Sequence, residues 1–406
     1  MNTKWIPLFA TNFLGVMNNN FLKNVIIFMS VTLLAQKNKE FVVTLASGLY
    51  VVPYIFFSPI GGRLAKTHRK STIMFWSKMS ELPLFALACV GFMLHSLYIV
   101  LFCIFAVGLI STLFSPSKYG LIRDIGGDEG ISFGTGTLEM FTFLGVLIAT
   151  FLASVLSDHY NHLVFACVVI GISILQIILS KMLRKVNETQ TIEVKNDTLN
   201  PLKFLIQSFR WAKTVSHSNT IILGLSTFWM LGSLIIMNLM IHCDKVLKMT
   251  NTQTGIVMNI SGIGIGLGSY ITGVLSRRKV NLGFTPLGAF GMMICFATLF
   301  ILKPHGIAFS GIILLTSFFS GMYMVPLSSW LQHSVEGRMQ GDMLAYSNFV
   351  IFFLIVVSAG LFGVVVPIIE TNGIWLLMFL IILMVLLVML FKVKEMWQRT
   401  ISLLKK

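Results

Sequence analysis

Three consecutive asparagines and a lysine lie inside the first long apolar stretch of the chain, residues 6–34. Asn18, Asn19 and Asn20 can donate and accept hydrogen bonds, and Lys23, one helical turn further on, can neutralise an anion. A stretch of about 20 apolar residues is long enough to span a bilayer, and polar groups at that depth usually face a bundle interior or a water-filled cavity. We therefore predict that this segment forms one wall of a substrate path through a membrane.

Three further charged side chains lie inside apolar stretches of the N-terminal half. Lys78 and Glu81 are three positions apart, which places them on one face of a helix. We interpret them as a mutual ion pair with a structural role, and substrate contact is the alternative. Glu139 has no such local partner, so we expect it to contact substrate, as we do for Lys23. A salt bridge between Lys23 and Glu139 is the competing interpretation.

The C-terminal half contributes neutral polar side chains. Asn238 and Asn348 lie inside apolar stretches, and Asn348 falls close to the position that corresponds to Glu139 when the two halves are aligned. We include both asparagines as candidate substrate contacts, with a packing hydrogen bond between helices as the alternative. The glycines from Gly262 to Gly268 resemble a nucleotide-binding loop only superficially, because no strand precedes them. We predict that they allow close helix packing instead.

No catalytic or metal-binding pattern accompanies these residues. The sequence contains no HExxH, HxxxxD or Walker pattern, and its five cysteines form no CxxC pair. We therefore expect no enzymatic activity, no metal ion and no cofactor.

The composition indicates which elements must position these side chains. Hydrophobic residues make up 56% of the chain and charged residues only 11%, whereas about a quarter of a soluble domain is charged. The sequence therefore predicts an all-α polytopic membrane protein, because a helix satisfies its own backbone hydrogen bonds in lipid. The apolar stretches predict twelve spanning helices, at residues 6–34, 41–63, 73–94, 97–116, 131–156, 163–182, 219–247, 253–275, 283–302, 306–326, 341–366 and 373–392.

The distribution of lysine and arginine predicts the orientation in the membrane. Most of the 30 cations lie in the loops on one side, which the positive-inside rule assigns to the cytoplasm, and both termini fall on that side. This distribution explains the net charge of +15 without a nucleic-acid partner. We predict an N-terminal six-helix bundle (1–185), a cytoplasmic linker with an amphipathic helix that begins at Pro201 (186–216), and a C-terminal six-helix bundle (217–406).

The two halves look like repeats. Residues 58–66 end the second span and residues 269–277 end the eighth, while Pro116 ends the fourth span and Pro326 the tenth, at nearly the same separation in both cases. We therefore give the two prolines structural roles. Two six-helix repeats joined by a long cytoplasmic linker are typical of the major facilitator architecture, in which substrate binds between the halves near the middle of the membrane.

Four local motifs carry a resemblance to a narrower family. Residues 13–20 (FLGVMNNN) are similar to an F-L-x-A-F-x-D-N pattern, and residues 115–120 (SPSKYG) match S-P-x-K-Y-G. Residues 136–139 (GTLE) resemble G-L-x-E, and residues 325–332 (VPLSSWLQ) resemble V-P-L-N-x-x-x-Q. Together these motifs resemble the bacterial lysophospholipid transporters, a branch of the major facilitator superfamily. The resemblance covers essentially the whole chain and adds Lys118 to the candidate substrate contacts.

Two positions depart from the pattern of that family. The acidic residue of its first helix falls on Asn19, which cannot ionise, so we do not expect ion coupling at this position. The acidic residue of its loop between the second and third spans falls on Lys66, close to Arg63. We expect both cations to act in gating, with a weaker charge clamp than the family pattern implies.

The resemblance implies a transporter that moves lysophospholipids such as lysophosphatidylethanolamine across the bacterial inner membrane, toward the cytoplasmic leaflet. There a separate acyltransferase and acyl-carrier-protein synthetase would re-acylate the lipid, and the transporter would act as a monomer. The lipid phosphate would suit Lys23 and a headgroup amine would suit Glu139. Substitution of either residue should then impair transport more than loss of the Lys78–Glu81 pair. Transport of another metabolite or a drug, and a non-transporting role as a membrane partner of the acyltransferase, are the alternatives.

Overall fold

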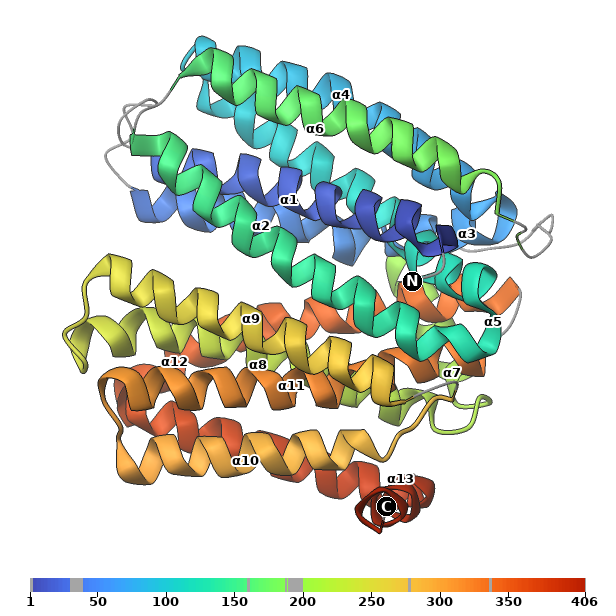
Figure 1. Ribbon diagram of the computed structural model, residues 1–406, viewed down its shortest axis with the longest axis vertical. Coiled ribbons are helices and arrows are strands. Elements are labelled where there is room, and N and C mark those ends of the chain that lie inside the picture. The colour runs from blue at the N-terminus through green and yellow to red at the C-terminus, as the bar shows by residue number, and fades with distance from the viewer. Residues whose placement is uncertain are drawn as a thin grey trace. The chain divides into compact units, whose positions relative to one another are not determined.

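The computed structural model describes residues 3–29, 39–158, 161–186, 188, 200–276, 279–335 and 338–405, and its elements are helices (Figure 1). In chain order they are η1 (Thr3–Trp5), α1 (Ile6–Met29), α2 (Lys39–Phe56), α3 (Ser58–Thr67), α4 (Lys70–Met93), α5 (Leu97–Asp158), α6 (His162–Leu183), α7 (Pro201–Ala212), α8 (Ser218–Lys245), α9 (Asn251–Leu275), α10 (Phe284–Leu302), α11 (Gly306–Ser334), α12 (Arg338–Lys392) and α13 (Lys394–Leu404). The predicted all-α fold is confirmed.

Two of the helices, α5 and α12, each contain two spanning segments. The backbone of α5 turns at Gly127 (φ 58°, ψ −170°) and that of α12 at Glu370 (φ 57°, ψ 176°). A positive φ is easily adopted by glycine and is uncommon for other residues. Eight of the described helices are long and apolar enough to span a membrane. When α5 and α12 are counted twice and α1 and α2 are added, the helices account for the twelve predicted spans.

The two prolines that were predicted to end spans do not end helices. Pro116 lies inside α5, whose first segment continues to Gly127, and Pro326 lies inside α11, which continues to Ser334. A proline removes one backbone N–H, but neighbouring helices and local adjustments in a membrane bundle compensate for that loss. The helices therefore run past the prolines for two further turns or more.

The second predicted span, 41–63, is two helices instead of one. The break between α2 and α3 lies at Phe57, whose backbone is non-helical (φ −108°, ψ 1°). Pro59 lies in the first turn of α3. Backbone N–H groups of the first turn make no hydrogen bond within the helix, so the N–H that proline lacks costs nothing there. The proline therefore favours a new helix start at this point.

The described chain divides into two compact units. The first comprises Met1–Gly127, Leu144–Ser208 and Glu336–Asn348, and the second comprises Asp128–Phe143, Phe209–Val335 and Phe349–Lys406. The beginning of α12 thus packs within the first unit, and a middle part of α5 packs within the second. The bundle and linker boundaries drawn from the sequence repeats stay a prediction, although Pro201 does begin a helix, α7.

Aromatic contacts between α1, α4 and α6 hold the first unit together. The ring centroid of Phe165 lies 4.9 Å from that of Phe92 and 5.9 Å from that of Phe21, and all three side chains are buried. In lipid, helices associate through such close packing, because removal of apolar surface from water no longer drives association. These contacts fix α1, which carries the asparagines, against α6.

Close backbone packing between α9 and α11 characterises the second unit. A Cβ atom on Gly268 would overlap the carbonyl oxygen of Phe318, so no larger residue fits at this position. The hydroxyl groups of Ser261 and Ser317 share a hydrogen bond of 2.7 Å between the same two helices. The packing interpretation is therefore confirmed for Gly264 and Gly268 of this run of glycines.

Candidate substrate-binding site

A polar cavity lies inside the first unit, among α1, α2, α4 and α5. Its volume is about 60 Å³, which is room for about two water molecules. Its polar lining comes from all four helices and consists of Thr11, Asn12, Asn19, Tyr50, Tyr54, Lys78, Ser111, Ser115 and Lys118. Polar groups gathered around a cavity among spanning helices are the first candidate for a ligand site.

Lys78, the cation of the Lys78–Glu81 pair, lies at the wall of this cavity. The Lys78 Nζ atom is 2.8 Å from both carboxylate oxygens of Glu81, and the two side chains are 2% and 1% exposed. The Lys78 Nζ atom also lies 4.4 Å from the centroid of the Phe114 ring, and Lys78 itself lines the cavity. The predicted ion pair is therefore observed, in a position where its cation can also meet a ligand.

The Lys78 ammonium group lies directly beside Gly15, where a larger residue would leave it less space. A Cβ atom at this position would lie 3.0 Å from Lys78 Nζ and 3.2 Å from Gln176 Oε1. Gln176, on α6, is 1% exposed, and its amide makes no hydrogen bond within the described part of the chain. A polar seam between α1 and α6 thus continues the cavity behind Lys78.

The three consecutive asparagines point in different directions, because successive residues of a helix are 100° apart. Asn19 Nδ2 donates to Ser111 Oγ at 3.2 Å, and Asn19 lines the cavity. Asn18 Nδ2 instead donates to Ser173 Oγ on α6 at 3.0 Å, and Asn20 Nδ2 donates to the carbonyl of its own helix at Val16, at 2.9 Å. Of the predicted polar wall, the structure places Asn19 at the cavity and uses Asn18 for helix packing.

Two tyrosines of α2 line the cavity, and sequence analysis did not identify them. The ring centroids of Tyr50 and Tyr54 lie 6.2 Å apart, and the Tyr50 side chain makes polar contact with Asn19 and Ser111. Their spacing in an apolar helix was a usable signal, because a buried hydroxyl group needs a partner. The Lys23 Nζ atom lies 6.0 Å from the centroid of the Tyr50 ring. Of these two described residues, Tyr50 lines the cavity and Lys23 does not.

The SPSKYG segment contributes two polar residues to the cavity. Ser115 and Lys118 both line it, and Lys118 Nζ lies 4.6 Å from the centroid of the Tyr119 ring. Asn348, from the beginning of α12, donates from Nδ2 to Ser115 Oγ at 3.0 Å. The structure thus brings two predicted contacts, Lys118 and Asn348, to the same end of the cavity.

The other two predicted contacts belong to the second unit. Glu139, on α5, is 2% exposed, and Asn238, on α8, is fully buried. The amide of Asn238 makes no hydrogen bond within the described residues. The roles of Glu139 and Asn238 in substrate binding stay predictions, as does the salt bridge between Glu139 and Lys23.

A buried ion pair joins α3 to α12. The Lys66 Nζ atom lies 2.7 Å from Asp342 Oδ2, and the two side chains are 1% and 17% exposed. A Cβ atom on Gly341 would lie 2.7 Å from the carbonyl oxygen of Gly62, so the two helices cross closely beside this pair. The charge of Lys66 thus has a partner on α12, and its gating role and the weakened charge clamp stay predictions. Arg63 is half-buried one turn earlier on α3, and its gating role stays a prediction.

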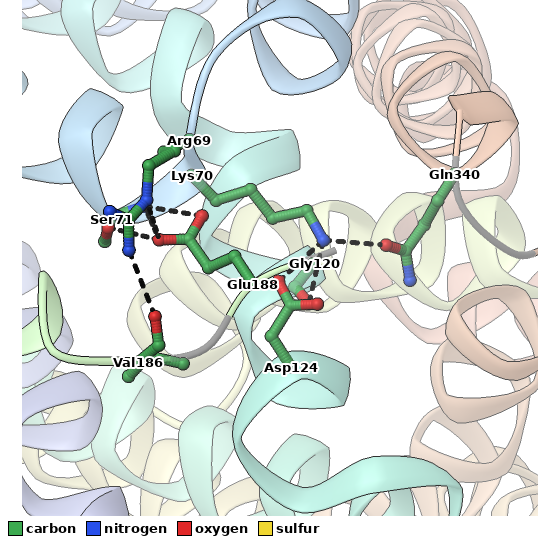
Figure 2. A network of polar contacts seen from close by, with 8 residues as sticks. All are labelled: Arg69, Lys70, Ser71, Gly120, Asp124, Val186, Glu188 and Gln340. Carbon is green, nitrogen blue, oxygen red and sulfur yellow. Dashed lines mark hydrogen bonds and ion pairs between the residues drawn. The ribbon is translucent and has the colours of Figure 1, made fainter. Parts of the chain in front are cut away.

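A second ionic network surrounds the beginning of α4 (Figure 2). The Lys70 Nζ atom donates to Asp124 Oδ2 at 2.7 Å and to Gln340 Oε1, on α12, at 3.4 Å. The Glu188 carboxylate accepts the backbone N–H of Ser71 at 3.3 Å, where the N-terminus of α4 favours an anion. Glu188 thereby ties the chain that follows α6 to α4. Sequence analysis missed this network, since its partners are far apart in the chain.

Comparison with known proteins identifies the family. Residues 8–360 match the sequence model of the Major Facilitator Superfamily. The chain belongs to this superfamily.

Three solved structures show the same fold for this major facilitator protein. A bacterial homologue of the iron transporter ferroportin in an outward-facing state has a TM-score of 0.73 at 14% identity, covering 94% of this chain and 97% of that one. The human organic anion transporter MFSD10 has a TM-score of 0.73 at 13% identity (94% and 100% covered), and the Escherichia coli fucose:proton symporter FucP has 0.66 at 14% (94% and 97%).

Curated relatives are more informative about the branch of the superfamily. The lysophospholipid transporter LplT of Pectobacterium carotovorum is 23% identical over 332 residues, which cover 78% of this chain and 76% of the relative. The protein of that name from Photorhabdus laumondii is 24% identical over 344 residues, covering 80% and 81%. The protein is thus an integral membrane transporter of the major facilitator superfamily that is similar to lysophospholipid transporters.

Proposed function

We propose that this major facilitator protein transports lysophospholipids across the bacterial inner membrane, toward the cytoplasmic leaflet. The observation that carries the proposal is the Lys78 ammonium group, buried in a membrane bundle and placed at the wall of a polar cavity. The relatives named lysophospholipid transporters support the class of substrate. The distribution of cations supports cytoplasmic termini.

The cavity offers the groups that recognise a phosphodiester. An ammonium group is a strong donor to phosphate oxygens, and hydroxyl and amide groups add neutral donors. Lys78 and Lys118 provide the charge, while Tyr50, Ser111 and Asn19 provide the neutral donors. The present volume of about 60 Å³ is too small for a whole headgroup, so binding requires movement of the surrounding helices.

A second cavity of the first unit is apolar and supports a lipid over a soluble substrate. It measures about 250 Å³ and is lined by Phe21, Leu152, Val155, Leu156, Val164 and Val168. Val155 and Val164 are about half exposed on spanning helices, so this cavity borders the lipid. A groove of this kind can accept part of an acyl chain, and each buried methylene is worth about 0.8 kcal/mol when it leaves water.

The geometry favours Lys78 over Lys23 as the phosphate contact. Lys78 lines the polar cavity, whereas Lys23 lies beside the ring of Tyr50. We therefore expect loss of Lys78 to impair transport more than loss of Lys23, which reverses the order drawn from the sequence. Glu139 and Asn238 remain part of the proposal as further substrate contacts. A separate acyltransferase remains part of it as the partner that re-acylates the lipid.

Uptake by proteoliposomes tests the function directly. Purified protein in liposomes should move labelled lysophosphatidylethanolamine across the bilayer, and the variant with Lys78→Gln and Glu81→Gln should be slower by about tenfold. That variant is a fair test because it removes both charges and leaves no unpaired ion in the bundle. Lys23→Gln is the matched control. Uptake no faster than in protein-free liposomes would refute lysophospholipid transport, and uptake of glycerophosphoethanolamine instead would indicate a soluble substrate.

A further inference from the structure

The Lys78–Glu81 pair carries opposite charges that cancel inside the membrane. Both side chains are at most 2% exposed, and the ammonium is 2.8 Å from each carboxylate oxygen. A buried pair is tolerated because each charge neutralises the other, whereas one partner left alone costs about 3–5 kcal/mol. Any ligand that takes Lys78 away from Glu81 must therefore also supply a positive charge for Glu81.

We propose that this pair selects zwitterionic headgroups by exchange of partners: the phosphate of the lipid binds Lys78 while its ammonium group binds Glu81. The inference rests on the proposed function and specifies the charge of the headgroup that the same cavity accepts. After the exchange each buried charge again has a partner, and the net charge of the site is unchanged. A phosphate on its own would take Lys78 and leave Glu81 as an unpaired buried anion.

The positions of the two residues suit a ligand with two opposite charges. Lys78 and Glu81 are three residues apart on α4, so their Cβ atoms are about 5–6 Å apart. In an ethanolamine phosphate a two-carbon bridge holds the ammonium close to the phosphate, and a primary ammonium has three donors for a carboxylate. Both charges of one headgroup can therefore meet both residues of the pair together.

The other groups around the pair do not replace Glu81 as the partner of an ammonium. Tyr50 and Tyr54 lie close to Glu81 and are neutral donors that suit the phosphate. Lys118 adds a second cation to the cavity wall, but it is only half-buried, with its Nζ atom over the Tyr119 ring, so its charge is more strongly screened. Glu81 therefore dominates the response of the site to headgroup charge.

The test compares two lysophospholipids of different charge in proteoliposomes. Wild-type protein should transport zwitterionic lysophosphatidylethanolamine at least about tenfold faster than anionic lysophosphatidylglycerol, a difference of about 1.4 kcal/mol. Glu81→Gln removes the carboxylate that would lose its partner when a phosphate binds Lys78. The ratio of zwitterionic to anionic transport rates should therefore fall by about tenfold or more in this variant. Glu188→Gln is the matched control, because it removes an acid of the first unit outside the cavity and should leave the ratio unchanged.

The outcomes separate this inference from the proposed function. Transport of both lipids with the same ratio in wild type and Glu81→Gln would overturn the exchange of partners and leave lysophospholipid transport intact. Equal rates for the two lipids in wild type would also overturn it, and that measurement does not depend on the folding of any variant. Glu81→Asp keeps the charge and should keep the wild-type preference, whereas loss of the preference in this variant contradicts the inference. No uptake of either lipid by wild type would instead remove the proposed function itself.

Discussion

The ion pair between Lys66 and Asp342 should contribute measurably to the stability of the protein. The Nζ and Oδ2 atoms are 2.7 Å apart, and the side chains are 1% and 17% exposed. Removal of one partner of a fully buried pair costs about 3–5 kcal/mol, because the other charge is left alone. Asp342 keeps some solvent contact, so Lys66→Ala should cost about 3 kcal/mol, the lower end of that range. Asp342→Asn strands the more deeply buried Lys66 and should cost more.

Paired replacements separate the interaction from the bulk of the side chains. Lys66→Met combined with Asp342→Leu should be more stable than either single variant, since neither charge remains in the bundle. Exchange of the two residues, Lys66→Asp with Asp342→Lys, should recover much of the loss. The coupling energy of this double-mutant cycle should fall between about 0.5 and 3 kcal/mol.

Reversible unfolding of the purified protein in mixed detergent micelles measures these free energies. Arg63→Ala is the matched control, because it removes a half-buried cation from the same helix, and it should cost about 1 kcal/mol or less. Additive effects of the single substitutions, with a coupling energy near zero, would refute the view that the pair holds α12 on α3.

Two further predictions concern the cavities of the first unit. Gly15→Ala places a methyl group 3.0 Å from Lys78 Nζ and should displace the ammonium group. Uptake of lysophosphatidylethanolamine should therefore fall several-fold. Unchanged uptake would contradict this, because it would show that Lys78 adjusts to the methyl group without loss of function. Val168→Trp should fill the apolar cavity of about 250 Å³ and slow the uptake of long-chain lysophospholipids more than that of short-chain ones. Leu175→Trp, at an exposed position of the same helix, is the control, and an equal effect on all chain lengths would exclude this cavity as the acyl-chain site.

Local patterns in the sequence predicted much of the fold and part of the site. Apolar stretches of spanning length predict the helices, because the bilayer sets the required length and every backbone group must be satisfied within its own segment. The pairing of Lys78 with Glu81 was equally predictable, since residues three apart on a helix are neighbours wherever the helix lies. The close packing at Gly268 follows in the same way from small residues in an apolar helix.

Only the tertiary structure decided which polar groups meet. Asn18, Asn19 and Asn20 are equivalent in the sequence, but the helices beside α1 direct Asn19 to the cavity and Asn18 to α6. The partner of Lys66 lies 276 positions away, so no pattern around the lysine could show that its charge is neutralised. A sequence determines the helices through interactions between near neighbours, whereas the cavity and its ion pairs depend on which helices come together.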